Sequence, residues 1–226
     1  MNGFNSIAID GPAGAGKSSL ARRLSKELGY IYVDTGAIYR SVGLAAHRRG
    51  LDTKDETAVS AMLPEINIEI RYNDEGEQRM FLDGEDVSAE IRLPEISICA
   101  SNVSAMPAVR VYLLEMQRRM ARAHNAIMDG RDIGTVVLPD AELKIFLTAS
   151  AAARAQRRLL ELQGKGVKAD YDEVLRDIEY RDKQDTSRAA APLKAADDAV
   201  RVDTSDIDFE QSAALLRGIV RERLGV

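Results

Sequence analysis

The residues most suited to chemistry form a short glycine-rich segment near the amino terminus, Gly11-Pro12-Ala13-Gly14-Ala15-Gly16-Lys17-Ser18. This segment matches the phosphate-loop pattern G-x-x-x-x-G-K-[ST], and it lies between an apolar run and a stretch with helical spacing, as the motif requires. The glycines let successive backbone N–H groups point inward at phosphate oxygens, with the positive end of the following helix behind them. The segment therefore predicts a nucleoside triphosphate site, and a plain glycine-rich turn is the alternative.

Two side chains in this loop have specific expected roles. Lys17 can reach the terminal phosphates, and Ser18 can ligate Mg²⁺. The residues predicted to bind the triphosphate here are Gly11, Pro12, Ala13, Gly14, Ala15, Gly16, Lys17, Ser18 and Ser19. The loop leaves the reaction open, since GTPase switches and motor ATPases also carry it. No Asn-Lys-x-Asp motif for guanine occurs in the chain, and its length of 226 residues favours a small phosphotransferase.

Two further polar segments, residues 34–40 and 129–135, follow apolar runs. Because ligands of open α/β sheets bind beyond the carboxyl ends of the strands, a second substrate is expected here, beside the triphosphate. Asp129 has the arrangement of an acid that orients Mg²⁺ or its waters. Three neighbouring side chains have a functional interpretation and an ordinary one, the latter being helix capping for Thr35, a solvated position for Arg40 and a simple ion pair for Arg131.

Charged side chains recur on two predicted helices near the end of the chain. The first helix, over residues 151–163, carries three arginines, and the second carries an aspartate between two arginines. In order, these side chains are Arg154, Arg157, Arg158, Arg181, Asp185 and Arg188. The two helices are joined by Gly164-Lys165-Gly166, and one interpretation is a lid that closes over phosphates. The other is an ordinary charged hairpin, in which Glu161, Asp177 and Glu179 pair with the arginines.

The elements that must position these residues alternate between strand and helix. Short apolar runs at residues 6–10, 30–33, 126–128, 143–147 and 198–202 predict strands. Helical spacing follows four of them directly, which predicts a parallel sheet covered on both faces. The segment at residues 66–87 differs, because its residues alternate with period two around turn sequences. It predicts an antiparallel hairpin or three-stranded meander inserted into the parallel core.

Composition narrows the functional classes. The chain has 45% hydrophobic and 30% charged residues and a net charge of -5, which fits a globular domain and argues against a general nucleic-acid binder. No apolar run approaches the ~18 residues of a membrane span, so no membrane partner is expected. The single Cys99 suits a reducing, cytoplasmic location. Of 31 basic residues, 23 are Arg, which indicates either composition bias or several bidentate anion contacts.

In their order and spacing, these segments resemble the bacterial cytidylate kinases, which are nucleoside monophosphate kinases. The matching residues are 11–18, 34–40, Ser101, 107–110, 129–137, 143–150, 154–158, 181–193 and 203–205. The resemblance implies a three-layer α/β P-loop fold with a central parallel sheet, a helical lid and a small antiparallel region for the monophosphate. It also implies transfer of the γ-phosphoryl group of MgATP to CMP, and to dCMP, by a monomer. Kinases of UMP or another monophosphate, and a P-loop regulatory ATPase, remain alternatives.

The resemblance also implies a division of the chain and roles for individual residues. One domain over residues 1–226 would comprise a core (about 1–60, 100–150 and 190–226), a monophosphate-binding insertion (about 61–99) and a lid (about 151–189). Implied contacts of the acceptor are Ser101, Arg110 and Asp132 with cytosine, Arg181 and Asp185 with ribose, and Thr35, Arg40, Arg131 and Arg188 with phosphate. Arg154, Arg157 and Arg158 would face the ATP phosphates. The implied catalytic residues are Lys17, Asp129, Arg131 and Arg188.

Overall fold

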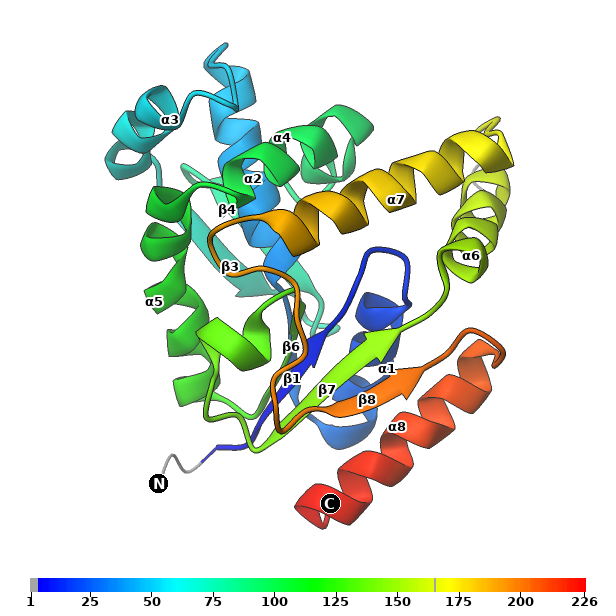
Figure 1. Ribbon diagram of the computed structural model, residues 1–226. Coiled ribbons are helices and arrows are strands. Elements are labelled where there is room, and N and C mark those ends of the chain that lie inside the picture. Colours follow the sequence, from blue (N-terminus) through cyan, green and yellow to red (C-terminus); the bar gives the residue numbers. More distant parts are fainter. Residues whose placement is uncertain (1–3, 165) are drawn as a thin grey trace.

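The computed structural model describes residues 4–164 and 166–226, so Lys165 of the expected glycine connection lies outside it. A five-stranded sheet runs through the centre (Figure 1). Its strands, in spatial order, are β2 (Ile31–Asp34), β6 (Ala126–Gly130), β1 (Ser6–Asp10), β7 (Leu143–Thr148) and β8 (Val200–Asp203). Every neighbouring pair is parallel. The predicted parallel sheet is therefore confirmed, and the carboxyl ends of all five strands lie at one edge.

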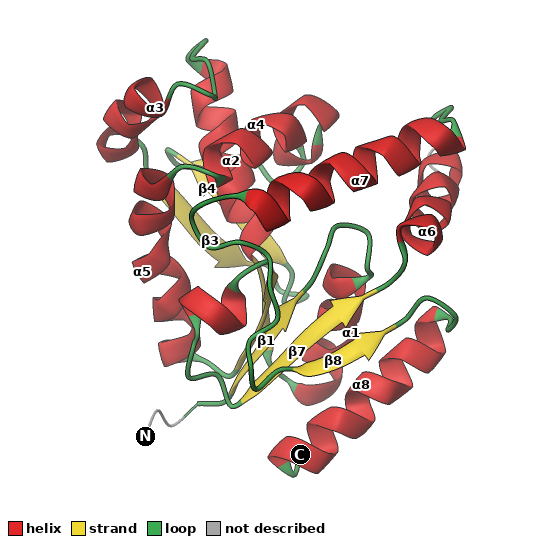
Figure 2. Cartoon of the chain, viewed as in Figure 1, coloured by secondary structure: helices red, strands yellow, loops and turns green. Residues whose placement is uncertain are grey.

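Helices cover both faces of this sheet and make three layers (Figure 2). On one face, Ile7 and Ile9 of β1 pack in an apolar cluster with α1 (Lys17–Leu28) and α8 (Phe209–Leu224). Ala8, between them, belongs to the opposite cluster, which includes residues of α2 (Thr35–Arg48) and α5 (Pro107–Ala123). Since successive side chains of a strand point to opposite faces, the uninterrupted apolar run of β1 is the pattern of a strand buried on both sides.

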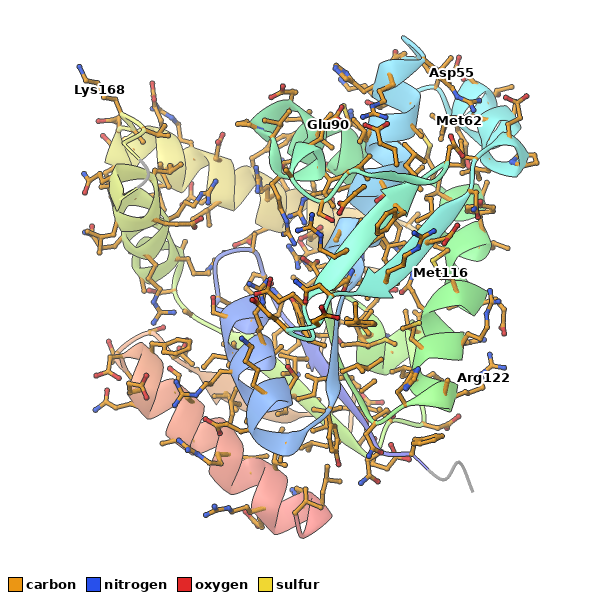
Figure 3. All side chains as sticks on the ribbon, turned by 180° about the vertical axis from the view of Figure 1, so that it is seen from behind. Asp55, Met62, Glu90, Met116, Arg122 and Lys168 are labelled. Carbon is orange, nitrogen blue, oxygen red and sulfur yellow. The ribbon has the colours of Figure 1, made fainter. Side chains whose placement is uncertain are left out.

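The segment that breaks the alternation forms a second, antiparallel sheet. Its strands are β3 (Ile68–Tyr72), β4 (Gln78–Leu82) and β5 (Glu85–Asp86), paired in chain order. The predicted three-stranded meander is thus present. Seen from behind in Figure 3, the small sheet lies beside α2 and α5, close to Met116. Helices and short turns complete this side of the molecule, namely α3 (Glu56–Met62), η1 (Leu63–Glu65), η2 (Glu90–Arg92), α4 (Pro94–Ser104) and the π-helical turn η3 (Ile133–Val137).

The last two helices before β8, α6 (Ala151–Gly164) and α7 (Tyr171–Ser187), form a hairpin. Ala155, Val174 and Ile178 make a small apolar cluster between them, separate from the two clusters that flank the sheet. In Figure 1, α7 crosses beyond the carboxyl ends of the strands, above the loop that joins β1 to α1. Among the described residues, no single helix is long and apolar enough to span a membrane, although α4 and α5, bent by 99°, pass that test together.

Candidate functional site

The phosphate loop joins β1 to α1 and owes its shape to glycine. Gly11 has φ +151°, and a Cβ there would lie 1.9 Å from the carbonyl oxygen of Leu147 on β7, so no other residue fits this close approach. Gly14 and Gly16 also have positive φ, and α1 begins directly after Gly16. The backbone therefore curls as the motif requires, at the amino end of a helix whose dipole favours anions.

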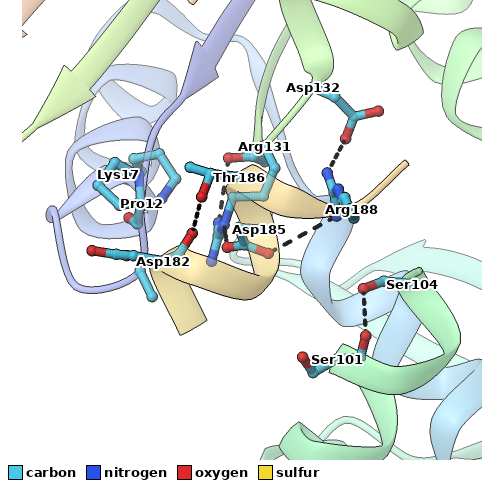
Figure 4. Close-up of polar contacts among 12 residues, drawn as sticks. Pro12, Lys17, Ser101, Ser104, Arg131, Asp132, Asp182, Asp185, Thr186 and Arg188 are labelled. Carbon is cyan, nitrogen blue, oxygen red and sulfur yellow. Dashed lines mark hydrogen bonds and ion pairs between the residues drawn. The ribbon is translucent and has the colours of Figure 1, made fainter. Parts of the chain in front are cut away.

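Lys17 is buried at the start of α1, and its Nζ donates to the carbonyl oxygen of Pro12 at 2.7 Å (Figure 4). Burial, reinforced by the nearby Arg131 guanidinium, lowers the pKa of Lys17 to about 7, although Asp129 and Asp10 act in the opposite direction. The nearby carboxylates therefore do not fully offset the cost of burying the Lys17 charge. A phosphate anion in the loop would stabilise its charged form.

Asp129, at the end of β6, faces the same loop. Its Oδ2 accepts the Ser18 hydroxyl at 2.8 Å and its Oδ1 accepts the Tyr32 hydroxyl at 2.7 Å. Burial, with the charge of Asp34 nearby, raises the pKa of this carboxyl. A carboxylate and a hydroxyl within hydrogen-bond distance of each other are hard oxygen donors of the kind that Mg²⁺ prefers. The residues present therefore fit the magnesium ligands expected from the sequence, and Tyr32 is a partner that the sequence did not indicate.

The start of α2 is joined to the same strand end. Thr35 donates its hydroxyl to the carbonyl oxygen of Asp129 at 2.7 Å, and the capping role considered for it belongs to Asp34, which accepts the N–H of Ala37 at 2.9 Å. Asp34 also accepts a hydrogen bond from Arg92 at 2.8 Å. Arg40 lies 4.0 Å from the other oxygen of this carboxylate. Burial raises the pKa of Asp34, but the two guanidinium groups outweigh it and the net pKa is lowered.

A chain of alternating arginines and aspartates continues the site from β6 to α7 (Figure 4). Arg131 donates to Asp185 at 2.6 Å, and Arg188 lies 3.9 Å from the other oxygen of Asp185. Arg188 also donates to Asp132 at 3.3 Å, and Arg110 of α5 donates to the second oxygen of Asp132. Burial lowers the pKa of Arg188, with the nearby Arg110 charge acting in the same direction. Five predicted acceptor-site residues thus form one network.

Four predicted acceptor residues lie outside this network: Thr35 and Arg40, described above, and Ser101 and Arg181. Ser101 is exposed on α4, and its carbonyl oxygen accepts the Ser104 hydroxyl at 3.0 Å. The carbonyl oxygen of Ser104 in turn accepts from Arg110 at 3.1 Å, so the end of α4 reaches the network through this bond. Arg181 is exposed on α7, one turn before Asp185.

The three arginines of α6 point to different places. Arg154 is buried and donates to the carbonyl oxygen of Ala13 in the phosphate loop at 3.0 Å, while Asp182 of α7 accepts from it at 2.6 and 3.0 Å. Arg157 instead donates to carbonyl oxygens of Thr204 and Ile207, between β8 and α8. Arg158 has a 47% exposed side chain and pairs with Glu161, as considered from the sequence. Only Arg154 contacts the loop.

Sequence reasoning missed several charged partners. Asp182 lies three residues before Asp185, and this helical spacing places both carboxylates on one face of α7, so the sequence carried a signal for it. Arg92 carried none, because it reaches Asp34 from a turn far away in the chain. Asp10 directly precedes the phosphate loop and accepts two backbone N–H groups, from Ile133 and Gly134. Burial raises the pKa of this carboxyl to about 6.

The glycine-rich loop, the parallel sheet and the arginines at its carboxyl edge define a P-loop phosphotransferase. The family model described as cytidylate kinase matches residues 7–221. A cytidylate kinase from Pelotomaculum thermopropionicum is 51% identical over 216 residues, which cover 96% of each chain. Another, from Lactobacillus johnsonii, is 47% identical over 223 residues, or 99% of this chain and 96% of that protein. The chain belongs to the cytidylate kinase family.

A comparison with solved structures supports the fold alone. A crystal structure of an uncharacterized protein from Eubacterium ventriosum matches with a TM-score of 0.54 and 12% identity. The match covers 97% of this chain and 99% of that one. At this identity the likeness extends to the arrangement of the elements and not to the residues of the site.

Proposed function

We propose that this protein transfers the γ-phosphoryl group of ATP to CMP and forms ADP and CDP. Membership of the cytidylate kinase family supports this activity. The assignment to particular residues rests on one observation, which is that the two candidate sites lie side by side. The phosphate loop with Lys17 and the network around Arg131 and Asp132 lie at the carboxyl ends of adjacent strands, β1 and β6. Two nucleotides bound there would meet phosphate to phosphate.

In the proposed reaction, an oxygen of the CMP phosphate forms a bond to the γ-phosphorus, and the bond from that phosphorus to the oxygen bridging to ADP breaks. The attacking oxygen is already anionic, so the protein needs no strong general base. Loop N–H groups and Lys17 would hold the donor phosphates, with Arg154 beside them, while Arg40, Arg131, Arg188 and Thr35 would hold the acceptor phosphate. Catalysis would then come from positioning and from neutralising charge on the transferred group.

Selectivity for cytosine is assigned to Asp132, Arg110 and Ser101. The amino group of cytosine is a donor that the Asp132 carboxylate can accept, while ring N3 and O2 are acceptors that suit Arg110 and a hydroxyl. Uracil would turn an oxygen toward the carboxylate and leave buried polar groups mispaired, at ~1–3 kcal/mol each. Arg181 and Asp185 are assigned to the ribose. A carboxylate that uses the 3′-hydroxyl need not reject deoxyribose, so dCMP is the proposed second acceptor.

Magnesium is the proposed cofactor, held by Ser18 with Asp129 through water. When bound, it would neutralise charge on the donor phosphates. The observed bond between the Ser18 hydroxyl and Asp129 supports this pair, because both oxygens already face the loop. Tyr32 would keep the carboxylate in place from the other side.

We also propose a functional division of the chain. Residues of about 151–189 would act as a lid that closes on the phosphates and excludes water, and residues of about 61–99 would serve the monophosphate. The separate small apolar cluster of the α6–α7 hairpin supports motion of that part as a unit. We expect the protein to act as a cytoplasmic monomer on small-molecule substrates, without a nucleic-acid or membrane partner.

The test is ADP formation from MgATP with CMP, dCMP, UMP, AMP and GMP supplied separately. Rapid turnover with the two cytidine nucleotides alone is the expected result. A preference for UMP would remove the assignment of Asp132 to the cytosine edge. Slow hydrolysis that ignores every monophosphate would instead indicate a regulatory ATPase.

A further inference from the structure

Asp10 ends β1 and directly precedes the phosphate loop, yet its carboxylate is directed at a different segment. Its Oδ1 accepts the N–H of Ile133 at 2.8 Å, and its Oδ2 accepts the N–H of Gly134 at 2.7 Å. The residue is only 4% exposed. Both carboxylate oxygens therefore hold consecutive backbone groups of the turn η3, and water does not compete for them.

The residues attached to this turn are two that the proposed function assigns to the acceptor. Asp132 directly precedes Ile133 in the chain, and Arg131 directly precedes Asp132. Across the sheet, Asp10 is paired in register with Gly130, so the carboxylate reaches past the end of β6 to the turn beyond it. Asp10 thus fixes the backbone within two residues of both side chains.

The surroundings leave this turn little freedom. A Cβ on Gly134 would lie 3.4 Å from Asp10 Oδ2 and 3.1 Å from Cδ of Lys144, and a Cβ on Gly130 would lie 2.6 Å from a side-chain carbon of Ile133. The strand end at Gly130 therefore has no room for a side chain beside Ile133, whereas at Gly134 the Lys144 side chain would have to shift by a few tenths of an ångström. The two bonds from Asp10 set the turn within that narrow space.

We propose that Asp10 is a positioning residue of the acceptor subsite, which aims Arg131 and Asp132 by holding the N–H groups of Ile133 and Gly134. This inference rests on the proposed function, since the acceptor roles of Arg131 and Asp132 belong to it. Two other roles compete with this one: shaping the phosphate loop that follows, and stabilising the sheet. They predict different patterns of substrate binding.

The experiment uses Asp10→Asn in the full chain. An amide has one oxygen acceptor where the carboxylate has two, so one backbone N–H would face an NH₂ group and lose its bond. The control is Glu142→Gln. Glu142 accepts the N–H and the hydroxyl of Ser6, at 2.7 and 2.8 Å, and so ties down the opposite end of the same strand. Each variant removes one carboxylate charge at an end of β1, Asp10→Asn at its carboxyl end and Glu142→Gln beside Ser6 at its amino end.

CMP and MgATP binding are measured separately by titration calorimetry, and exchange of the Ile133 and Gly134 amides is followed by NMR. For Asp10→Asn, we expect CMP affinity to fall at least about tenfold, equivalent to ~1.4 kcal/mol. MgATP affinity should change less than about threefold, and at least one of the two amides should exchange faster. Glu142→Gln should leave both affinities unchanged.

Equal losses for the two nucleotides, a larger loss for MgATP, or unchanged CMP affinity would overturn the proposal, as would the same pattern in Glu142→Gln. If Asp10→Asn does not fold, Asp10→Glu tests the same contacts, because it keeps both acceptor oxygens but moves them by one methylene. A selective loss of CMP supports the proposal there too, and an equal loss or none overturns it. Failure of the proposed function is distinguishable, because the monophosphate panel with the unaltered protein would reveal another acceptor, and the selective loss would then appear with that acceptor.

Discussion

The phosphate loop and the acceptor network differ in how they would bind anions in the proposed reaction. The loop uses main-chain groups whose positions follow from glycine and from the strand and helix at its ends, and Gly11 tolerates no Cβ against Leu147. The acceptor network uses long side chains from β6, α5 and α7, in which each arginine is held by an aspartate, as Arg131 is by Asp185. The shape of the loop is therefore determined locally in the chain. The network depends on tertiary packing, and in the proposed reaction its arginines would exchange an aspartate for the acceptor phosphate.

This contrast predicts that the two regions can be disabled one at a time, and Lys17→Met should have the largest effect. Removing the ammonium from the donor phosphates should lower kcat by about 10²–10³-fold. Steady-state kinetics measure this loss. CMP binding, titrated without ATP, should stay within about twofold because the network does not use Lys17 for its hydrogen bonds. Lys26→Met, an exposed position on the same helix, is the control and should leave both quantities unchanged. A matching loss of CMP affinity would mean that the two regions are not separable.

The reverse experiment is Asp132→Asn. Arg110 and Arg188 both donate to this carboxylate, so the variant leaves two largely buried guanidinium groups without their shared counter-charge. We expect CMP affinity to fall about ten- to hundredfold, from ~1–3 kcal/mol of lost and mispaired bonds. MgATP affinity should change less than about threefold, and calorimetric titration of each nucleotide gives both values.

The control for this substitution is Asp86→Asn, which removes a carboxylate from the exposed pair with Arg79. Exposed pairs contribute little, so both affinities should be retained. Equal losses of CMP and MgATP in Asp132→Asn would contradict a role in reading the base.

A third prediction concerns the electrostatic link between the regions. Burial is the main cause that lowers the pKa of Lys17 to about 7, and the charge of Arg131 contributes to it. Bound phosphates should raise this pKa again. Above it, Lys17 is largely neutral and must take up a proton on binding, whereas below it the proton is already present. MgATP binding should therefore take up as much as about one proton near pH 8 and less near pH 6, and affinity should fall as pH rises through this range.

Calorimetry in buffers of different ionisation enthalpy measures this proton number. The control is Lys17→Met, in which the uptake near pH 8 should disappear while protons from the nucleotide itself remain. The same uptake with and without Lys17 would assign the proton to another group, and Asp10, whose pKa burial raises to about 6, is one candidate.

The same contrast explains which features could be predicted from the sequence. The strands, the helices and the phosphate loop follow from local patterns, and their order was enough to place residues 34–40 and 129–135 at one edge of the sheet. The partners of the arginines did not follow, because ion pairs such as Arg92 with Asp34 join segments far apart in the chain. Spacing along α6 suggested that Arg154, Arg157 and Arg158 act together. Neighbouring positions on a helix do not fix where long, flexible side chains end.

The smallest expected effect tests that last point. Arg158→Ala should change kcat and the KM for ATP by less than about twofold, since its side chain is 47% exposed and its pair with Glu161 is a surface contact. Arg154→Ala is the matched comparison from the same helix. It removes the buried guanidinium that contacts the loop carbonyl of Ala13 and the partly buried carboxylate of Asp182. We therefore expect kcat or the KM for ATP to worsen by about tenfold or more. Comparable losses in the two variants would show that α6 turns Arg158 toward the phosphates when nucleotide binds, and that the hairpin moves further than its contacts here indicate.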